Sequence, residues 1–221
     1  MTDPHTEPAG EVSSDDLVPG WLAALVLVLL LAVVGLGGFL ARGLISEPRA
    51  TSPQQREVDT RLAEVTADPA DPRARLALGY AYQQAGRYDE ALAEYEAVLE
   101  IVPTDTAALY NTGVIHLELG QATEAEEVLW EVLEVNPEHV LAAKVLGEHY
   151  AEKGHYRSLL EAVRPAAQAN ESSADLQYLM GLAYENLGRA DWAEARYRLA
   201  LRYYPDMTGA RDGLERLGVT P

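Results

Sequence analysis

Apolar residues are arranged in two different ways along this chain. Residues 21–40 form an unbroken run without a charged side chain, and thirteen of the twenty are Leu, Val or Phe. Further on, Val58, Leu62 and Val65 recur at the three- and four-residue spacing of one helix face. Over residues 72–206, helical stretches alternate with breaks at Gly and Pro. The pattern predicts an all-α chain, with one long apolar helix followed by a series of short helices.

The second region repeats itself every 34 residues. Each unit carries a Gly, then Tyr or His, then a second Gly, then a mostly small apolar residue, then a larger one. These positions are Gly79, Gly113, Gly147 and Gly181; Tyr82, His116, Tyr150 and Tyr184; Gly86, Gly120, Gly154 and Gly188; Ala91, Ala125, Leu159 and Ala193; and Tyr95, Leu129, Val163 and Tyr197. A unit of this size cannot bury its apolar face alone, so stacked neighbours are expected to share one core.

This pattern resembles the tetratricopeptide repeat, whose unit is two antiparallel helices with small residues where they cross. The resemblance covers about the C-terminal two-thirds of the chain and implies an α-solenoid of four repeats, at 72–105, 106–139, 140–173 and 174–207. Glycine inside a helix costs about 1 kcal/mol relative to alanine. The first Gly of each unit is therefore expected to let two backbones approach closely. The second Gly is expected to end the first helix in a left-handed conformation.

The segments on either side of the repeats have simpler interpretations. Residues 1–19 are polar and acidic, contain no Lys or Arg, and are expected to form a disordered tail. Residues 43–71 are expected to be a linker followed by a capping helix at 54–67. Residues 208–221 are expected to be a second capping helix and a short tail. Capping elements of this kind keep the open ends of a solenoid soluble.

Residues 20–42 are predicted to be a single transmembrane helix. Twenty residues at a rise of about 1.5 Å each span about 30 Å, the thickness of a bilayer core. A cleaved signal peptide is the competing interpretation, but the basic region that would precede it is missing and the apolar run is too long.

The flanking charges suggest an orientation for this helix. Lys and Arg are missing from its N-terminal flank, whereas Arg42 and Arg49 follow it closely. The positive-inside rule then places the repeats in the cytoplasm and the chain in the cell (inner) membrane. The resemblance to bacterial membrane-anchored repeat proteins, many of which display their repeats on the outer side, leaves an extracytoplasmic location as the alternative.

The third unit departs from the pattern at three positions. Leu159 replaces a small residue, Glu171 stands where Pro103, Pro137 and Pro205 close the other units, and Pro165 falls inside the second helix. Proline in a helix interior removes one backbone hydrogen bond and clashes with the preceding turn. One hypothesis is that this helix is kinked or ends near Arg164, which would change the curvature between units three and four. The other is local drift without consequence.

The resemblance implies that the first helices line a concave groove where a ligand binds. The groove residues carried over by register are Leu76, Tyr80, Gln84, Tyr110, Asn111, Val114, Leu117, Glu118, Leu141, Lys144, Glu148, Glu152, Tyr178, Leu182 and Glu185. An exposed row of Tyr and Leu edged with charge is typical of a peptide-binding surface, although some of these side chains are expected to pack between units. Relatives that hold the acidic tails of heat-shock chaperones use a Lys and Asn clamp. Only Asn111 matches it, so this role is rejected.

Charge favours a basic partner. The formal net charge is −18, which argues against binding to nucleic acid. Residues 88–143 contain thirteen Asp or Glu and no Lys or Arg. Most of these carboxylates are expected to be solvated, but the imbalance predicts a field that attracts a basic or basic-amphipathic protein segment and weakens as salt rises.

No pattern in the chain indicates an enzyme. There is no cysteine, no phosphate-binding glycine loop and no His pair at a helical metal-ligand spacing. His149 with Glu152, or with Glu148 and His155, is better explained as a set of surface residues. We therefore expect no catalytic residue, no metal site and no cofactor.

These features together predict a membrane-anchored scaffold or adaptor that binds a partner peptide or protein in its groove. The alternative is an assembly-chaperone subunit of a membrane complex, because the chain also resembles the anchored repeat subunits that hold apocytochrome in cytochrome c maturation. A component of some larger membrane complex is compatible with the same features.

Overall fold

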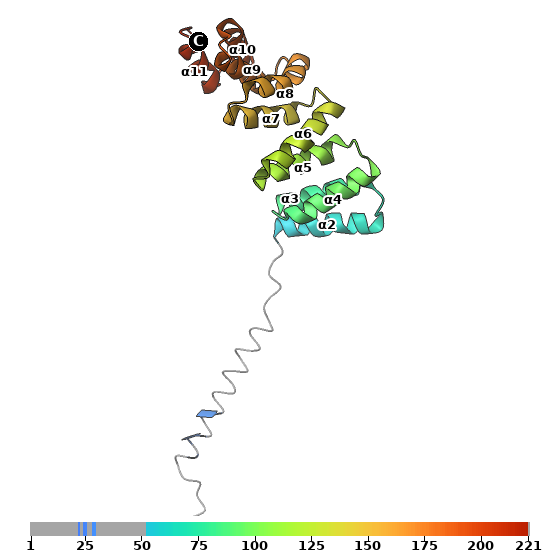
Figure 1. Ribbon diagram of the computed structural model, residues 1–221. Helices are drawn as coiled ribbons and strands as arrows, with labels where there is room; N and C mark the ends of the chain where they lie inside the picture. Colours follow the sequence, from blue (N-terminus) through green and yellow to red (C-terminus); the bar gives the residue numbers. More distant parts are fainter. Residues whose placement is uncertain (1–21, 23, 26–27, 30–51, 221) are drawn as a thin grey trace, which may run out of the picture. The chain divides into compact units, whose positions relative to one another are not determined.

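A computed structural model describes residues 52–220 and, near the N-terminus, residues 22, 24, 25, 28 and 29 (Figure 1). The chain divides into two units, residues 1–51 and 52–221. None of the helices in the described residues combines the length and the hydropathy that a bilayer span requires. The predicted tail at 1–19 and linker at 43–51 lie outside the described residues, as does the predicted membrane helix at 20–42 apart from the five positions above.

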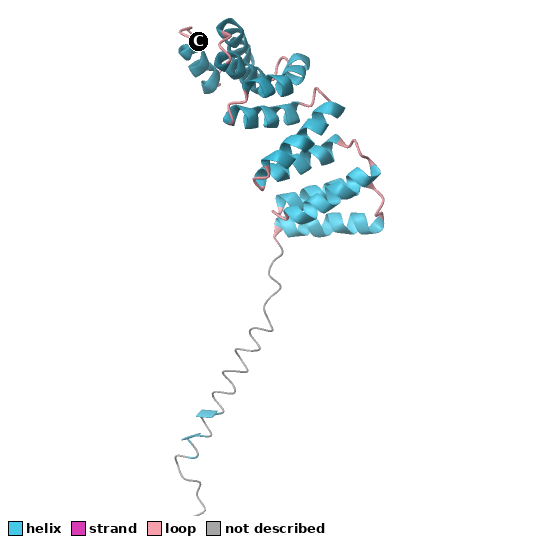
Figure 2. Cartoon of the chain, in the orientation of Figure 1, coloured by secondary structure: helices cyan, strands magenta, loops and turns pink. Residues whose placement is uncertain are grey.

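The second unit is built from helices, and its described residues contain no strand (Figure 2). The all-α solenoid is therefore confirmed for this part of the chain. The helices are α2 (Pro53–Ala67), α3 (Pro72–Gln84), α4 (Tyr88–Ile101), α5 (Thr106–Glu118), α6 (Ala122–Val135), α7 (Val140–Glu152), α8 (Tyr156–Ala169), α9 (Ala174–Asn186), α10 (Ala190–Tyr203) and α11 (Thr208–Arg216). The helices from α3 to α10 form four successive pairs, which we number as repeats one to four.

Each first helix ends at a glycine in the left-handed conformation, as the sequence predicts. The φ angle lies between 71° and 74° at Gly86, Gly120, Gly154 and Gly188. In repeat one, the N–H of Arg87 then donates to the carbonyl of Tyr82 at 2.9 Å. Such bonds satisfy the last carbonyls of the helix and turn the chain back into the second helix.

The glycines inside the first helices make room for side chains. A Cβ atom would lie 2.6 Å from a side-chain atom of the second helix at Gly79 (Tyr95), Gly113 (Leu129), Gly147 (Val163) and Gly181 (Tyr197). The close approach predicted at these positions exists, but the nearest atoms belong to a side chain. The expectation that two backbones meet there is wrong in this respect.

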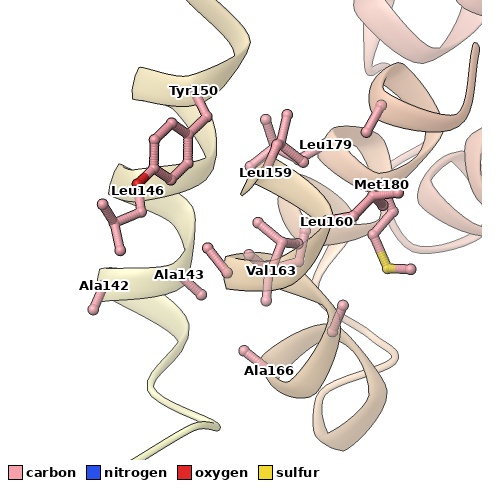
Figure 3. Close-up of a cluster of buried hydrophobic side chains, with 14 of the residues drawn as sticks. Ala142, Ala143, Leu146, Tyr150, Leu159, Leu160, Val163, Ala166, Leu179 and Met180 are labelled. Atoms are coloured by element: carbon pink, nitrogen blue, oxygen red, sulfur yellow. The ribbon is translucent and has the colours of Figure 1, made fainter. Parts of the chain in front are cut away.

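The buried apolar side chains form two clusters that divide within α5. Ala108 and Ile115 belong to the first cluster, which also contains Tyr95. Leu109, on another face of the same helix, belongs to the second cluster, which reaches Leu214 in α11. Figure 3 shows part of the second cluster, to which α7 contributes side chains such as Leu146 and α8 contributes side chains such as Leu159 and Val163. The repeats thus share cores across their boundaries, as stacked units must.

Repeat three keeps both of its helices despite its departures in sequence. The second helix, α8, continues through Pro165 to Ala169, so the expectation that it ends near Arg164 is wrong. Leu159 is fully buried at the helix crossing. Because five residues follow Arg164 in the same helix, proline is tolerated here without ending it.

The turn after α8 is held by a residue of the next repeat. Gln177 of α9 is completely buried. Its Nε2 donates to the carbonyl of Ala167 at 3.0 Å and to that of Glu171 at 3.3 Å. Its Oε1 accepts from Arg196 at 3.0 Å. Every polar atom of this buried amide is thereby engaged, which avoids the cost of an unpaired buried polar group.

Candidate functional site: the inner face of the first helices

The packing between repeats determines which helices line the inner face. First helices of neighbouring repeats contact each other in α3 with α5 and in α7 with α9, and α9 also contacts the terminal α11, whereas α5 and α7 make no comparable contact among the described residues. Second helices of neighbouring repeats make no comparable contact in the described part of the chain. A stack that is tighter along one row of helices curves toward that row. The first helices therefore form the inner face.

All fifteen predicted groove residues lie on α3, α5, α7 and α9. Positions 34 residues apart form rows across the repeats, such as Leu76, Tyr110, Lys144 and Tyr178, or Tyr80, Val114, Glu148 and Leu182. The exposed members are Tyr80, Gln84, Glu118, Leu141, Glu148 and Glu152. The remaining nine are half-buried: Leu76, Tyr110, Asn111, Val114, Leu117, Lys144, Tyr178, Leu182 and Glu185.

A hollow of about 460 Å³ lies at the N-terminal end of this face, between α2 and α3. Tyr80, Ala81 and Ala77 of α3 line one side, and residues of α2 that include Glu57 and Arg61 line the other. Helix α2 lies 34 residues before α4, so it occupies the register of a second helix.

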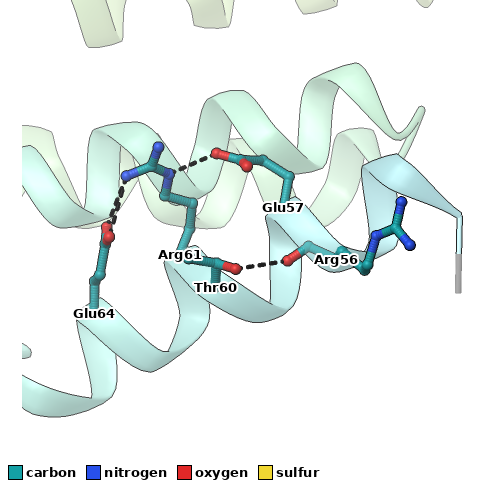
Figure 4. Close-up of polar contacts among 5 residues, drawn as sticks. All are labelled: Arg56, Glu57, Thr60, Arg61 and Glu64. Atoms are coloured by element: carbon teal, nitrogen blue, oxygen red, sulfur yellow. Dashed lines mark hydrogen bonds and ion pairs between the residues drawn. The ribbon is translucent and has the colours of Figure 1, made fainter.

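The face of α2 beside this hollow is polar. Arg61 bonds Glu57 at 2.8 Å and Glu64 at 3.0 Å along the same helix (Figure 4). These exposed pairs contribute little to folding stability.

The boundary between repeats two and three carries a polar cluster that sequence reasoning did not predict. Glu126 of α6 accepts hydrogen bonds from Lys153 Nζ at 2.6 Å and Tyr150 Oη at 3.2 Å. His149 Nε2 lies 2.8 Å from the same carboxylate, and Trp130 Nε1 donates to Tyr150 Oη at 2.9 Å. Burial acts to raise the pKa of Glu126, but the bonds from Lys153, His149 and Tyr150 outweigh it and lower that pKa.

Lys144 is the one cation among the predicted groove residues, and its charge is already matched. Its Nζ donates to Asp175 of the next repeat at 2.8 Å and lies 3.8 Å from Glu148. The bond to Asp175 raises the pKa of Lys144. Burial raises the pKa of Glu148, an effect that Lys144 only partly offsets. The middle of the inner face therefore presents carboxylates without a free positive charge among its predicted residues.

The C-terminal end of the inner face is covered by the chain itself. A Cβ atom on Gly209 of α11 would lie 2.9 Å from the ring of Tyr178, so the ring rests on this glycine. Arg216 of α11 bonds both carboxylate oxygens of Glu185, at 2.6 Å and 2.9 Å. Tyr197 also donates to Glu185 at 2.5 Å. The open part of the face therefore runs from repeat one to repeat three.

No chemistry-bearing cluster accompanies this face. Within residues 52–220 and the five described near the N-terminus, no three His, Asp or Glu side chains gather as a metal site. His149 is directed to Glu126 across the repeat boundary. His139 caps α7, where its Nδ1 accepts from the N–H of Ala142 at 3.1 Å, and burial lowers the pKa of this imidazole. Both histidines therefore have structural partners.

Family models for the tetratricopeptide repeat match residues 60–111, 83–148 and 174–207, together more than half of the chain. Residues 149–173 lie outside these matches, and this is where Leu159, Pro165 and Glu171 depart from the pattern. Repeats one and two are fully included, together with the first residues of repeat three and part of α2.

Among curated proteins, the chain is 29% identical to Superkiller complex protein 3 of Mus musculus over 128 residues. The match covers 57% of this chain and 8% of that protein, so the chain spans a small fraction of the relative's length. The human protein of the same name is 27% identical over 126 residues, again over 8% of its length.

Solved structures show the same fold. MamA from Desulfovibrio magneticus RS-1, from residue 41 to its end, aligns with a TM-score of 0.58 at 21% identity, covering 66% of this chain and 83% of that one. YrrB, described as a tetratricopeptide repeat protein with an unusual peptide-binding site, aligns with a TM-score of 0.60 at 16% identity, covering 72% of this chain and 91% of that one.

Proposed function

We propose, from the premise that this chain belongs to the tetratricopeptide repeat family, that it is a membrane-tethered adaptor binding a basic protein segment on its inner face. Proteins of this family are generally scaffolds without catalytic activity. One structure with this fold, YrrB, is described as having a peptide-binding site.

One observation carries the proposal: large apolar side chains stand exposed on the inner face. Tyr80 and Leu141 each expose 53% of their surface. Both lie on first helices whose other faces are packed, so their backbone positions are fixed by the core. Exposed apolar groups on a rigid surface, rimmed by polar residues, mark protein-binding sites. The hollow beside Tyr80 would accept one side chain of the bound segment.

The charge of the face favours a basic partner. Glu118, Glu148 and Glu152 are exposed on α5 and α7. The neighbouring cation, Lys144, is bonded to Asp175. A segment with Lys or Arg between apolar residues would pair with these carboxylates and cover Tyr80 and Leu141. The contribution of such exposed charges falls with salt.

A matched pair of variants tests this function. A fluorescein-labelled peptide of alternating Lys and Leu serves as the probe, and the full chain is held in neutral detergent. The triple variant Glu118→Gln, Glu148→Gln, Glu152→Gln should lose about tenfold in affinity, or about 1.4 kcal/mol. The variant Glu127→Gln, Glu131→Gln, Glu134→Gln removes the same charge from exposed sites on α6. If both variants lose the same affinity, the loss comes from the change in net charge alone, and this would contradict a binding site on the inner face.

The membrane tether and its orientation complete the proposal. The apolar run at 20–42 would anchor the repeats, and Arg42 and Arg49 favour repeats on the cytoplasmic side. A tether raises the local concentration of the repeats near membrane partners. Single cysteines at Ser13 and Thr220 test this, because the chain has none of its own. Labelling of Ser13→Cys alone by an impermeant reagent in intact cells is expected. Labelling of Thr220→Cys instead would contradict the orientation and favour the assembly-chaperone alternative.

A further inference from the structure

Three arginines surround one hollow of about 380 Å³ on repeats three and four. Arg157 and Arg164 lie two turns apart on α8, and Arg189 is the residue before α10. Leu160 and Leu187 complete the lining. All three arginines are exposed. This hollow is lined by second-helix and turn residues, so it is separate from the inner face.

These arginines lack the acidic partners that several other cations of the described residues have, and they share this with Arg196 and Arg202 of α10. In the described part of the chain, none of the three has a carboxylate oxygen within 4.0 Å. By contrast, Arg198 bonds Glu194 at 2.9 Å and Arg216 bonds Glu185 at 2.6 Å. The chain has 35 acidic residues and 17 Lys or Arg, so partners are not scarce.

The repeat register shows how the positive charge arises. In repeat one, Arg87 precedes the second helix and bonds Glu90 at 2.7 Å. Arg189 occupies the equivalent place in repeat four, but Trp192 stands where Glu90 would be. Likewise, Arg157 and Arg164 stand where repeat one has acidic residues, Asp89 and Glu96. A comparison of equivalent positions in the repeats would have shown this excess of positive charge from the sequence alone.

The surface beside the hollow is indented and partly aromatic. Two further hollows adjoin it through shared residues: one of about 490 Å³ through Arg157 and Leu187, and one of about 370 Å³ through Arg189. Trp192 lines the latter and exposes 57% of its surface. Its indole packs against Tyr184 with ring centroids 5.5 Å apart, which holds it in place. Asp191 contributes one opposing charge there.

We propose that Arg157, Arg164 and Arg189 bind an acidic segment of a partner protein, with a carboxylate or phosphate group entering the hollow. Guanidinium groups bind both oxyanions through paired hydrogen bonds. An anionic bilayer is a poorer occupant, because it would face the whole acidic domain, where residues 52–221 contain 29 Asp or Glu and 15 Lys or Arg. A short acidic segment faces only this edge, and its side chains can enter the hollows.

Fluorescence anisotropy tests the site in the full chain. The probe is a fluorescein-labelled peptide with two glutamates on each side of a phosphoserine. Each single variant, Arg157→Gln, Arg164→Gln or Arg189→Gln, should weaken binding about threefold, and the triple variant at least about tenfold. The matched control is Arg87→Gln, which removes one positive charge at the position equivalent to Arg189 and should change affinity by less than about twofold.

Two further measurements keep the test decisive. Thermal unfolding followed by circular dichroism should show the wild-type midpoint in the Arg157, Arg164 and Arg189 variants, because these three side chains are exposed. Equal weakening by Arg87→Gln and Arg189→Gln, or no saturable binding of the peptide, overturns the proposal. So does binding to anionic phosphatidylglycerol vesicles that is lost in the triple variant while the peptide does not bind.

Discussion

Repeats one and four have nearly the same interior and different surroundings. In both, a tyrosine of the second helix packs on a glycine of the first: Tyr95 on Gly79 and Tyr197 on Gly181. In both, the tyrosine hydroxyl then bonds the residue four positions after that glycine, Gln83 at 3.0 Å or Glu185 at 2.5 Å. The interior is thus a property of the repeat unit.

The surroundings decide what each repeat can bind. Tyr80 of repeat one is exposed beside a hollow, whereas Tyr178 and Glu185 of repeat four are covered by α11. On the second-helix side the contrast is reversed, because Arg87 is paired with Glu90, whereas Arg189 has no carboxylate partner among the described residues. One fold unit therefore offers its inner face at one end of the array and a basic edge at the other.

The largest effect is expected when the shared interior is emptied. Tyr95→Ala and Tyr197→Ala should each reduce the free energy of unfolding by about 3–5 kcal/mol, because both side chains are fully buried. Tyr197 also packs on Gly213 of α11, so its loss should detach the terminal helix as well. Denaturant unfolding measures the first effect, and hydrogen exchange over 208–216 the second. If the hydrogen-exchange protection of α11 is unchanged in Tyr197→Ala, then the terminal helix does not depend on the core of repeat four, which contradicts the prediction.

A smaller effect is expected when only the hydroxyl is removed. Tyr197→Phe should cost about 1.5–3 kcal/mol because it breaks a bond to a carboxylate. Tyr95→Phe should cost about 0.5–1.5 kcal/mol because its partner is the neutral amide of Gln83. Equal costs in the two variants, measured by denaturant unfolding, would show that the charge of Glu185 adds nothing to repeat four.

Acidification should affect repeat four through Glu185. The bond from Arg216 lowers the pKa of this carboxyl, and burial only partly opposes that effect. The resulting stabilisation is complete above the unfolded-state pKa of about 4.3 and is lost as pH falls through the lower folded-state value. Thermal midpoints of the wild type and Glu185→Gln should therefore converge between about pH 5 and pH 3. A difference that stays constant over this range would exclude the titration of Glu185 as its source.

The smallest effect is expected from giving repeat four the charge pair of repeat one. Trp192→Glu places a carboxylate three residues after Arg189, as Glu90 stands after Arg87. Affinity for the acidic phosphoserine peptide should fall about threefold with little change in the unfolding midpoint. The converse change, Glu90→Trp, frees Arg87 and should leave that affinity unchanged. If both substitutions change the affinity for the peptide by the same factor, the peptide does not bind specifically at the hollow on repeats three and four.

Much of this architecture could be predicted from the 34-residue period. The period identifies the helix pairs, the left-handed glycines that end the first helices, and the face that lines the inside of the array. It does so because each of these features depends on residues within one unit. A second backbone was expected to lie against Gly79, but the side chain of Tyr95 lies there instead. A pattern of small residues does not say whether a backbone or a side chain fills the space.

Contacts between units were harder to predict. Glu126 and Lys153 are 27 residues apart, and the acidic stretch from 88 to 143 offers many other carboxylates as partners. Of the hypotheses for α8, the one in which it ends near Arg164 was wrong, because it considered only the local cost of Pro165 and not the burial of Ala166 and Ala167 beyond it. The covering of Glu185 by Arg216 depends on how α11 packs, which its sequence pattern does not specify.

The central claim is that the first helices hold a protein segment on their inner face. A photo-reactive phenylalanine analogue at Tyr80, compared with one at Tyr203, tests it most directly in native membranes. Both tyrosines are exposed, by 53% and 46%, but Tyr80 lies on the inner first helix α3 and Tyr203 on the second helix α10. The account predicts one discrete, salt-sensitive protein adduct from position 80 and none from position 203. The same adducts from both positions, or none from position 80, would contradict it.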